Sequence, residues 1–176
     1  MCLAIVVIHF INSQMMGGAL SVYGIHPRSL YSLPYIYTSP WLHGSWLHVL
    51  SNLVGFAVLS GLCLLRGIPF YLKSSAIIIT ITGILVWIFA RPAVHIGASG
   101  WVFGLWSLSM ALAWFQRSFL NILIALFVLV FYGGMVFGMM PGNRMISFES
   151  HIFGALAGVI CAYIMTRSSP KVSKKS

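Results

Sequence analysis

The sequence predicts an all-α membrane protein, a single bundle of six transmembrane helices. Three observations predict this fold class: 60% of the 176 residues are hydrophobic, the mean hydropathy is +0.98, and six long apolar runs follow one another along the chain. Only 6% of the residues are charged, whereas a soluble domain has roughly 25%. Backbone groups in lipid must find hydrogen-bond partners within their own segment, so we expect each apolar run to be a helix.

The six apolar runs are the expected membrane-spanning helices. A helix needs about 20 apolar residues to cross the bilayer, so six crossings leave little of the chain for a soluble domain. In chain order the runs cover about residues 3–19, 46–65, 68–90, 98–116, 118–138 and 151–167. We expect residues 1–167 to form one membrane core and residues 168–176 to form a basic cytoplasmic tail.

The segment between the first two runs, residues 20–45, differs in composition from the runs that flank it. Its turn-forming and interfacial residues are Gly24, Pro27, Pro34, Pro40, Tyr23, Tyr31, Tyr35, Tyr37 and Trp41, and Trp46 follows it. This segment is too polar to span the membrane, and Tyr and Trp favour the headgroup region. We expect a structured loop that lies in the outer interface.

The charges are strongly unbalanced, with ten Lys and Arg residues against one acid, Glu149. In a soluble protein this balance would suggest a nucleic-acid partner, but here the cations lie singly between apolar runs, so we exclude nucleic acid. Cytoplasmic loops carry an excess of Lys and Arg. An even number of spans places both termini on one side, which leaves Arg66, Lys73, Arg117, Arg167, Lys171, Lys174 and Lys175 inside and Arg28, Arg91 and Arg144 outside. This bias predicts a multi-pass membrane protein with both termini in the cytoplasm. We expect the membrane to be a bacterial inner (cell) membrane.

Polar residues stand at the outer ends of the second, fourth and sixth runs. They occur near His48, near Ser99 and near His151. Polar groups inside a membrane are costly, usually face the interior of the bundle and mark function. In the expected topology all three clusters lie at one membrane level, so they predict a shared site.

Ser99 and His151 are the candidate nucleophile and general base. Ser99 lies in Gly97-Ala98-Ser99-Gly100, where a loop enters a helix and free backbone N–H groups could stabilise an oxyanion. His151 is followed by Gly154 and Gly158 on one helical face, and Gly100 and Gly104 offer a matching pair on the fourth helix. Close packing of the two helices would bring His151 to Ser99, and Phe103, one turn below Ser99, could stack on the imidazole.

His48 and Asn52 are candidate oxyanion donors. They lie four residues apart on the second run and therefore share a helix face. Both side chains can donate hydrogen bonds, which a developing oxyanion requires beside the Ser99 amide. A polar contact that joins two helices is the alternative interpretation of this pair.

The single acid separates the possible protease chemistries. An aspartic protease needs two carboxylates, and the chain has no Asp. A zinc protease of the H-E-x-x-H type needs a glutamate and a histidine pair spaced by four, whereas His43 and His48 are spaced by five. Glu149 lies two residues before His151 and would point away from it on a regular helix. A Ser-His dyad remains, and this chemistry requires no metal and no cofactor.

Three separated motifs resemble those of the rhomboid family of intramembrane serine proteases. The family pattern is H-x4-H-x3-N, then G-x-S-G, then H-x2-G-x3-G. This chain matches it with His43, His48, Asn52, Gly97, Ser99, Gly100, His151, Gly154 and Gly158. One departure is Pro34-Tyr35, which stands where many members carry a Trp-Arg pair.

The resemblance implies a six-helix rhomboid-like bundle that cleaves transmembrane segments of single-span membrane proteins near the outer face. It implies that Ser99 is the nucleophile and His151 the general base. His48, Asn52 and the Ser99 amide would form the oxyanion site. His43 would have a structural role, tying the first loop to the second helix, and Phe103 takes the place of an aromatic residue that stacks on the catalytic histidine.

Two other functions stay open at this point. An inactive rhomboid-like protein would bind membrane helices without cleaving them, although such proteins characteristically lack the serine or the histidine. A small channel or transporter could also place polar residues in its spans, but no convincing internal repeat of the kind expected there is present. In a protease, glycines Gly133, Gly134 and Gly138 of the fifth run could form a mobile gate, and loose helix packing explains them equally well. The oligomeric state stays open.

Overall fold

Six α-helices account for most of the chain in the structure, a computed structural model that describes residues 1–142 and 146–167. The helices are α1 (Cys2–Phe10), α2 (Trp46–Leu64), α3 (Ile68–Phe89), α4 (Ser99–Phe115), α5 (Phe119–Tyr132) and α6 (Phe148–Arg167). A π-helical turn, Ile11–Met15, extends α1, and a 3-10 helix, Gly133–Met139, extends α5. The expected tail, residues 168–176, and the expected outer cation Arg144 lie outside the described residues.

The helix boundaries agree with the apolar runs to within a few residues, with three differences. The first helix ends early because Gly17 and Gly18 adopt positive φ values of 55° and 89°, which a helix cannot continue. The fifth changes from α to 3-10 at Gly133. The sixth begins at Phe148, three residues before His151, because the Ser147 hydroxyl accepts a hydrogen bond from the Ser150 amide and caps the first turn.

The all-α membrane fold is confirmed. The length of each helix bears on how many of the six cross the membrane. Within the described residues, four helical segments have the length and apolar composition of a membrane span: Trp46–Leu64, Ile68–Phe89, Phe119–Met139 and Phe148–Arg167. The other two apolar helices, Cys2–Met15 and Ser99–Phe115, are shorter. Six crossings therefore stay a prediction.

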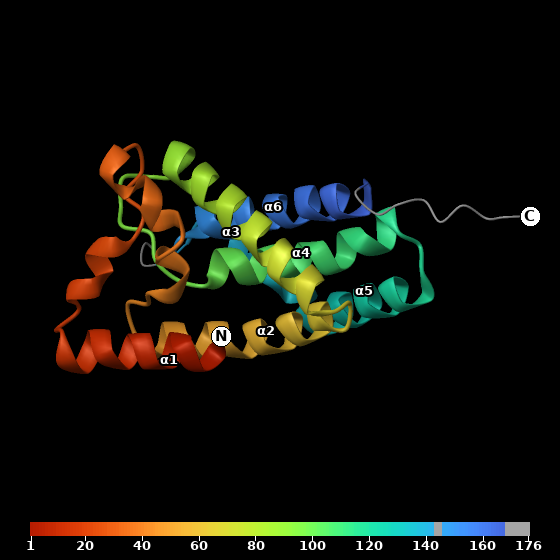
Figure 1. Cartoon of the computed structure of the whole chain (residues 1–176), viewed down its shortest axis with the longest axis horizontal. Helices are drawn as coiled ribbons and strands as arrows, with labels where there is room; N and C mark the ends of the chain where they lie inside the picture. Colours follow the sequence, from red (N-terminus) through yellow and green to blue (C-terminus); the bar gives the residue numbers. More distant parts are fainter. Residues whose placement is uncertain (143–145, 168–176) are drawn as a thin grey trace, which may run out of the picture.

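Helix α4 lies at the centre of the bundle. Figure 1 shows α4 between α2 on one side and α6 on the other, and α4 also packs against α3 and α5. Twelve of its 17 residues are buried, on all sides of the helix, as expected for a helix surrounded by others. Helices α2, α4 and α6 all begin at the end of the bundle that carries the long first loop (Figure 1).

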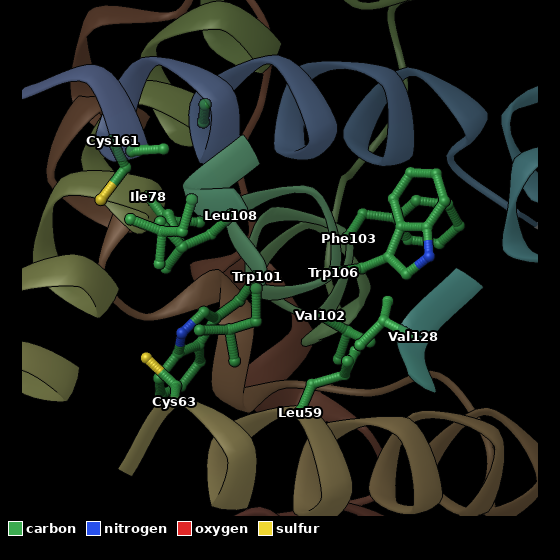
Figure 2. Packing of buried hydrophobic residues seen from close by; sticks show 14 of the residues in the cluster. Leu59, Cys63, Ile78, Trp101, Val102, Phe103, Trp106, Leu108, Val128 and Cys161 are labelled. Carbon is green, nitrogen blue, oxygen red and sulfur yellow. The ribbon is translucent and has the colours of Figure 1, made fainter. Parts of the chain in front are cut away.

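The hydrophobic core is built around the side chains of α4. Figure 2 shows Trp101, Val102, Phe103, Trp106 and Leu108 of this helix among side chains of the surrounding helices. The partners labelled there are Leu59 and Cys63 of α2, Ile78 of α3, Val128 of α5 and Cys161 of α6. This core fixes the position of α4. It therefore also fixes Ser99, which is the first residue of that helix.

Helices α4 and α6 pack through the two glycine pairs that the sequence predicts. A Cβ added at Gly154 would overlap the Gly100 carbonyl, and one added at Gly158 would overlap the Gly104 carbonyl. A Cβ at Gly104 would lie 3.2 Å from the Gly154 carbonyl oxygen. The two backbones are therefore in direct contact, which small residues alone permit.

The first loop folds into three short 3-10 helices, Ala19–Tyr23, Leu30–Ile36 and Ser39–Trp41. The Arg28 guanidinium donates to the carbonyls of Ile88 and Ala90 at 3.1 and 2.8 Å, so it caps the C-terminus of α3. Ile25 and His95 form an isolated antiparallel bridge. In this chain, which lacks the Trp-Arg pair, these contacts hold the loop to the segment between α3 and α4.

Candidate active site

A cavity of about 500 Å³ lies beside the first turns of α2, α4 and α6. Its polar lining consists of His48, Ser51 and Asn52 of α2, Ser99 of α4 and His151 of α6. Apolar residues complete it, among them Val54 of α2, Phe103 of α4 and Tyr132 of α5. The three polar clusters that the sequence places at one membrane level therefore meet in one cavity.

Ser99 is the first residue of α4, and backbone geometry explains why glycine precedes it. The first N–H groups of a helix have no partner within the helix, so the Ser99 amide is available to a ligand. Gly97 has a φ of +124°, which favours glycine, and a Cβ there would lie 2.7 Å from the His48 ring. Gly97 thus allows the chain to turn into α4 while its backbone touches His48.

The His151 ring is held from two sides. Its Nδ1–H donates to the Gly138 carbonyl at 2.7 Å, since a carbonyl can only accept. Its face stacks on Phe103 with ring centroids 4.2 Å apart and planes 6° from parallel, as expected from the spacing of Phe103 and Ser99. A proton on Nδ1 leaves Nε2 with its lone pair, which is the form that a general base needs.

The Ser99 hydroxyl and the His151 ring line the same cavity without a hydrogen bond between them in the described part of the chain. Both residues are largely buried, with 8% of each exposed. Catalytic hydrogen bonds are often long before substrate binds and shorten in the complex. The arrangement is therefore compatible with a dyad that closes on a substrate.

His48 and Asn52 lie on the cavity-facing side of α2. The Asn52 Nδ2 donates one proton to the His48 carbonyl at 2.9 Å and keeps a second proton. The His48 ring rests against the Gly97 backbone and, edge to face, against the His43 ring at 5.0 Å. These two side chains and Ser99 line the same cavity.

His43 contacts both the start of α4 and, through the His48 ring, the first turn of α2. Its Nε2 accepts a hydrogen bond from the Ala98 amide at 3.3 Å, so this nitrogen is unprotonated. Burial of the ring, which is 1% exposed, and the nearby His48 lower the pKa of His43 from 6.5 to about 4. His43 therefore links the end of the first loop both to α2, through the His48 ring, and to the residue that precedes the candidate nucleophile.

Glu149 is turned away from His151, as its sequence position predicts, and its Oε1 lies 3.5 Å from the Arg91 Nε. The ring of His95, in the connection between α3 and α4, lies 2.7 Å from the Ser147 hydroxyl at the start of α6. Sequence reasoning missed the Gly138 carbonyl and the Ser147 hydroxyl. A backbone carbonyl leaves no residue signature, and Ser147 could have been noticed only as a helix cap three residues before Ser150.

The described residues contain no group of three or more His, Cys, Asp or Glu that could hold a metal ion. His43 and His48 are close, but the Ala98 amide already occupies the His43 Nε2. The cavity combines the Ser99 hydroxyl, the oriented His151 imidazole and side chains that can donate hydrogen bonds. These are the groups of acyl-transfer chemistry.

Comparison with known proteins gives a family and several relatives. The family model of the Rhomboid domain matches residues 27–168. Uncharacterized proteins of Mycobacterium bovis and Mycobacterium tuberculosis are each 34% identical over 167 residues, which cover 90% of this chain and 70% of each relative. An uncharacterized protein of Mycobacterium leprae is 31% identical over 144 residues, covering 76% of this chain and 56% of that protein.

Proposed function

Because the chain belongs to the rhomboid family, we propose that it is an intramembrane serine endopeptidase that uses a dyad of Ser99 and His151. The observation that carries the proposal is the orientation of His151. Gly138 and Phe103 hold its ring with Nε2 unprotonated, and His151 lines the same cavity as Ser99. A histidine that served packing alone would not need both constraints beside a serine at a helix N-terminus.

The proposed reaction is acyl transfer through Ser99. The Ser99 Oγ attacks the scissile carbonyl carbon while its proton passes to the His151 Nε2. The Ser99 amide, the Asn52 side-chain amide and a His48 ring N–H stabilise the oxygen that becomes negative. His151 then returns the proton to the leaving amine, and water, activated by the same ring, hydrolyses the acyl-enzyme.

The proposed substrates are transmembrane segments of single-span proteins. The cavity is bordered by α2 and by the end of α5 with its 3-10 extension, and its lining is mainly apolar. A peptide that leaves the helical state there finds donors in a site shielded by protein, which non-helical backbone in a membrane requires. We propose that the six helices all cross a bacterial cell membrane and that both termini are cytoplasmic, which places the site near the outer face.

The direct test is cleavage of a single-span reporter protein by the purified chain in liposomes. We expect wild type to cleave it, and Ser99→Ala and His151→Ala to lose activity by roughly 10³-fold or more, because the members of such a pair act as a unit. Ser109→Ala and His26→Ala are matched controls that should retain activity. The Ser109 hydroxyl donates to the Leu105 carbonyl of its own helix, and His26 lies in the first loop.

A fluorophosphonate probe gives a second readout that does not depend on the chosen substrate. It should label wild type and leave Ser99→Ala unlabelled. Cleavage by a folded Ser99→Ala variant would exclude the dyad. Binding of the reporter by a wild type that neither cleaves it nor reacts with the probe would favour an inactive member that binds membrane helices.

A further inference from the structure

A polar cluster joins the two segments that carry Ser99 and His151, on the side away from the cavity. Arg91 and His95 come from the connection between α3 and α4, and Ser147, Glu149 and Ser150 come from the start of α6. We call these five residues the clasp. Ser99 follows His95 by four residues, and His151 directly follows Ser150.

The hydrogen bonds of the clasp form a chain with one direction. The His95 Nε2–H donates to the Arg91 carbonyl at 3.0 Å, so Nδ1 is the acceptor and the Ser147 hydroxyl donates to it at 2.7 Å. With its proton used, the Ser147 oxygen accepts from the Ser150 hydroxyl at 2.7 Å and from the Ser150 amide at 3.2 Å. Burial lowers the pKa of His95, which keeps the ring neutral, as this order requires.

Arg91 adds three contacts to the same turn of α6. Its Nε faces the Glu149 carboxylate at 3.5 Å, its Nη2 donates to the Ile146 carbonyl at 2.8 Å, and its guanidinium lies over the Phe148 ring at 5.6 Å. The Arg91 and Glu149 side chains are 33% and 11% exposed. A partly buried guanidinium with several partners fixes both the orientation of the Arg91 side chain and its distance from the first turn of α6.

The clasp connects backbone positions that the catalytic geometry depends on. His95 is itself held by the bridge to Ile25, and its side chain is 3% exposed. Ser150 lies at the other end of this series of hydrogen bonds. Its carbonyl oxygen is 3.2 Å from the Cβ position of Gly100, so the first turns of α4 and α6 touch at this point. A shift of α6 by a fraction of an ångström there would move His151 relative to Ser99.

We propose that His95, acting through Ser147, is a positioning residue that holds the first turn of α6 in register with the start of α4 and so aligns His151 with Ser99. This inference rests on the proposed function. His95 touches no reacting atom. Its effect should therefore fall on kcat, since small displacements of reacting groups can cost roughly 10- to 100-fold in rate.

The test is a double-mutant cycle on reporter cleavage, with kcat and KM measured for protein that elutes as wild type. We expect His95→Ala and Ser147→Ala each to lower kcat about 10-fold with little change in KM, and the double variant to be no slower than either, because both remove one link. Ser147→Thr, which keeps the hydroxyl, should restore kcat. Additive losses, or losses in KM alone, would overturn the proposal.

Two further variants separate the clasp from other effects of the same residues. Ser147→Gly costs the helix N-cap little but removes the hydroxyl that donates to His95, so its kcat should stay low; a wild-type kcat would assign the role of Ser147 to capping alone. His26→Ala is the matched histidine control. It removes a ring that bonds to the Val22 carbonyl in the first loop, and its kcat should equal that of wild type.

Hydrogen exchange distinguishes failure of this inference from failure of the proposed function. If wild type cleaves no reporter, the protease proposal fails, and the clasp is then judged by amide exchange over residues 148–152. His95→Ala should speed that exchange, and His26→Ala should not. Equal exchange in the two variants would refute the clasp whatever the activity.

Discussion

His43 supports the start of α4 without lining the cavity that holds Ser99. Its ring is enclosed by the His48 ring, the His9 ring and the start of α4. The Ala98 amide donates to it, so a proton on that nitrogen would break the bond that positions the residue before Ser99. The protein therefore requires the neutral ring.

The stability of the protein should consequently fall as the pH falls through the range in which unfolded His43 gains a proton. The pKa of His43 is lowered from 6.5 to about 4 in the folded state, so between these values the unfolded state binds more protons and stability rises with pH. The difference corresponds to roughly 3 kcal/mol between pH 7 and pH 4. We expect the free energy of unfolding of His43→Leu, measured in mixed micelles, to depend less on pH than that of wild type.

The control for this experiment is His26→Leu, which removes a half-buried histidine of the first loop and leaves the contact between His43 and Ala98 in place. Other buried histidines, His95 among them, contribute in the same direction, so the comparison rests on the difference between the two variants. Parallel curves for wild type and His43→Leu would show that His43 is not the group that titrates.

At the residue level, the sequence predicted the side chains of the cavity and missed the backbone that orients them. Ser99, His151, His48 and Asn52 could be chosen because polar residues are scarce in this chain and each begins an apolar run. The Gly138 carbonyl that fixes the His151 tautomer could not be chosen, since every residue has a carbonyl. The link between His95 and Ser147 joins residues 52 positions apart, and no helical spacing connects them.

At the level of elements, the contact between α4 and α6 decides whether the candidate dyad can form. The backbones of Gly154 and Gly158 lie directly on those of Gly100 and Gly104. The Ser107 hydroxyl adds a bond across the same interface, donating to the Ala155 carbonyl at 2.7 Å. Such contacts rely on the absence of side chains rather than on apolar surface, because lipid tails are as apolar as leucine.

Gly154→Ala should separate α4 from α6 and reduce both stability and cleavage. The added methyl group would overlap the Gly100 carbonyl, which cannot move without displacing Ser99. Overpacking of this kind costs about 1–3 kcal/mol, and we expect reporter cleavage to fall more steeply than the folded fraction. Unfolding in mixed micelles and cleavage in liposomes measure the two effects.

Gly61→Ala is the matched substitution, because a Cβ at Gly61 on α2 meets nothing within 4 Å. Alanine is the better helix former, so this variant should be as stable as wild type or more stable, with unchanged cleavage. Equal behaviour of the two variants would mean that α4 and α6 do not depend on the glycine contact.

The elements themselves were predictable where hydropathy defines them and unpredictable where local geometry does. The boundaries of α2 and α3 follow the apolar runs, since Gly67 and the polar residues after Phe89 interrupt both the pattern and the helix. The change to a 3-10 helix at Gly133 leaves the run apolar, so composition could not reveal it. The early start of α6 depends on the Ser147 cap, a signal that an apolar run does not contain.

At the scale of the whole molecule, arginines at both ends of the bundle make structural contacts. At the end with the first loop, Arg28 caps α3 and Arg91 belongs to the clasp. At the opposite end, Arg66 donates from Nη2 to the Asn121 Oδ1 at 2.6 Å, joining α2 to α5, while Arg117 and Arg167 lie over the aromatic rings of Trp114 and Tyr163. Arginines at a membrane interface can thus build structure and mark topology together.

The orientation and the short helix α4 can be tested together by labelling single cysteines with a membrane-impermeant maleimide in cells. Cys2→Ser provides the background, because Cys63 and Cys161 are buried. Gly44 and Gln116 are exposed and lie at opposite ends of the run that contains α2, α3 and α4. If all three helices cross, the number of crossings between these positions is odd.

We expect Gly44→Cys to react in intact cells and Gln116→Cys to react only after permeabilisation. Reaction of both in intact cells would show that α4 does not cross. The reverse pattern would place the candidate site at the cytoplasmic face.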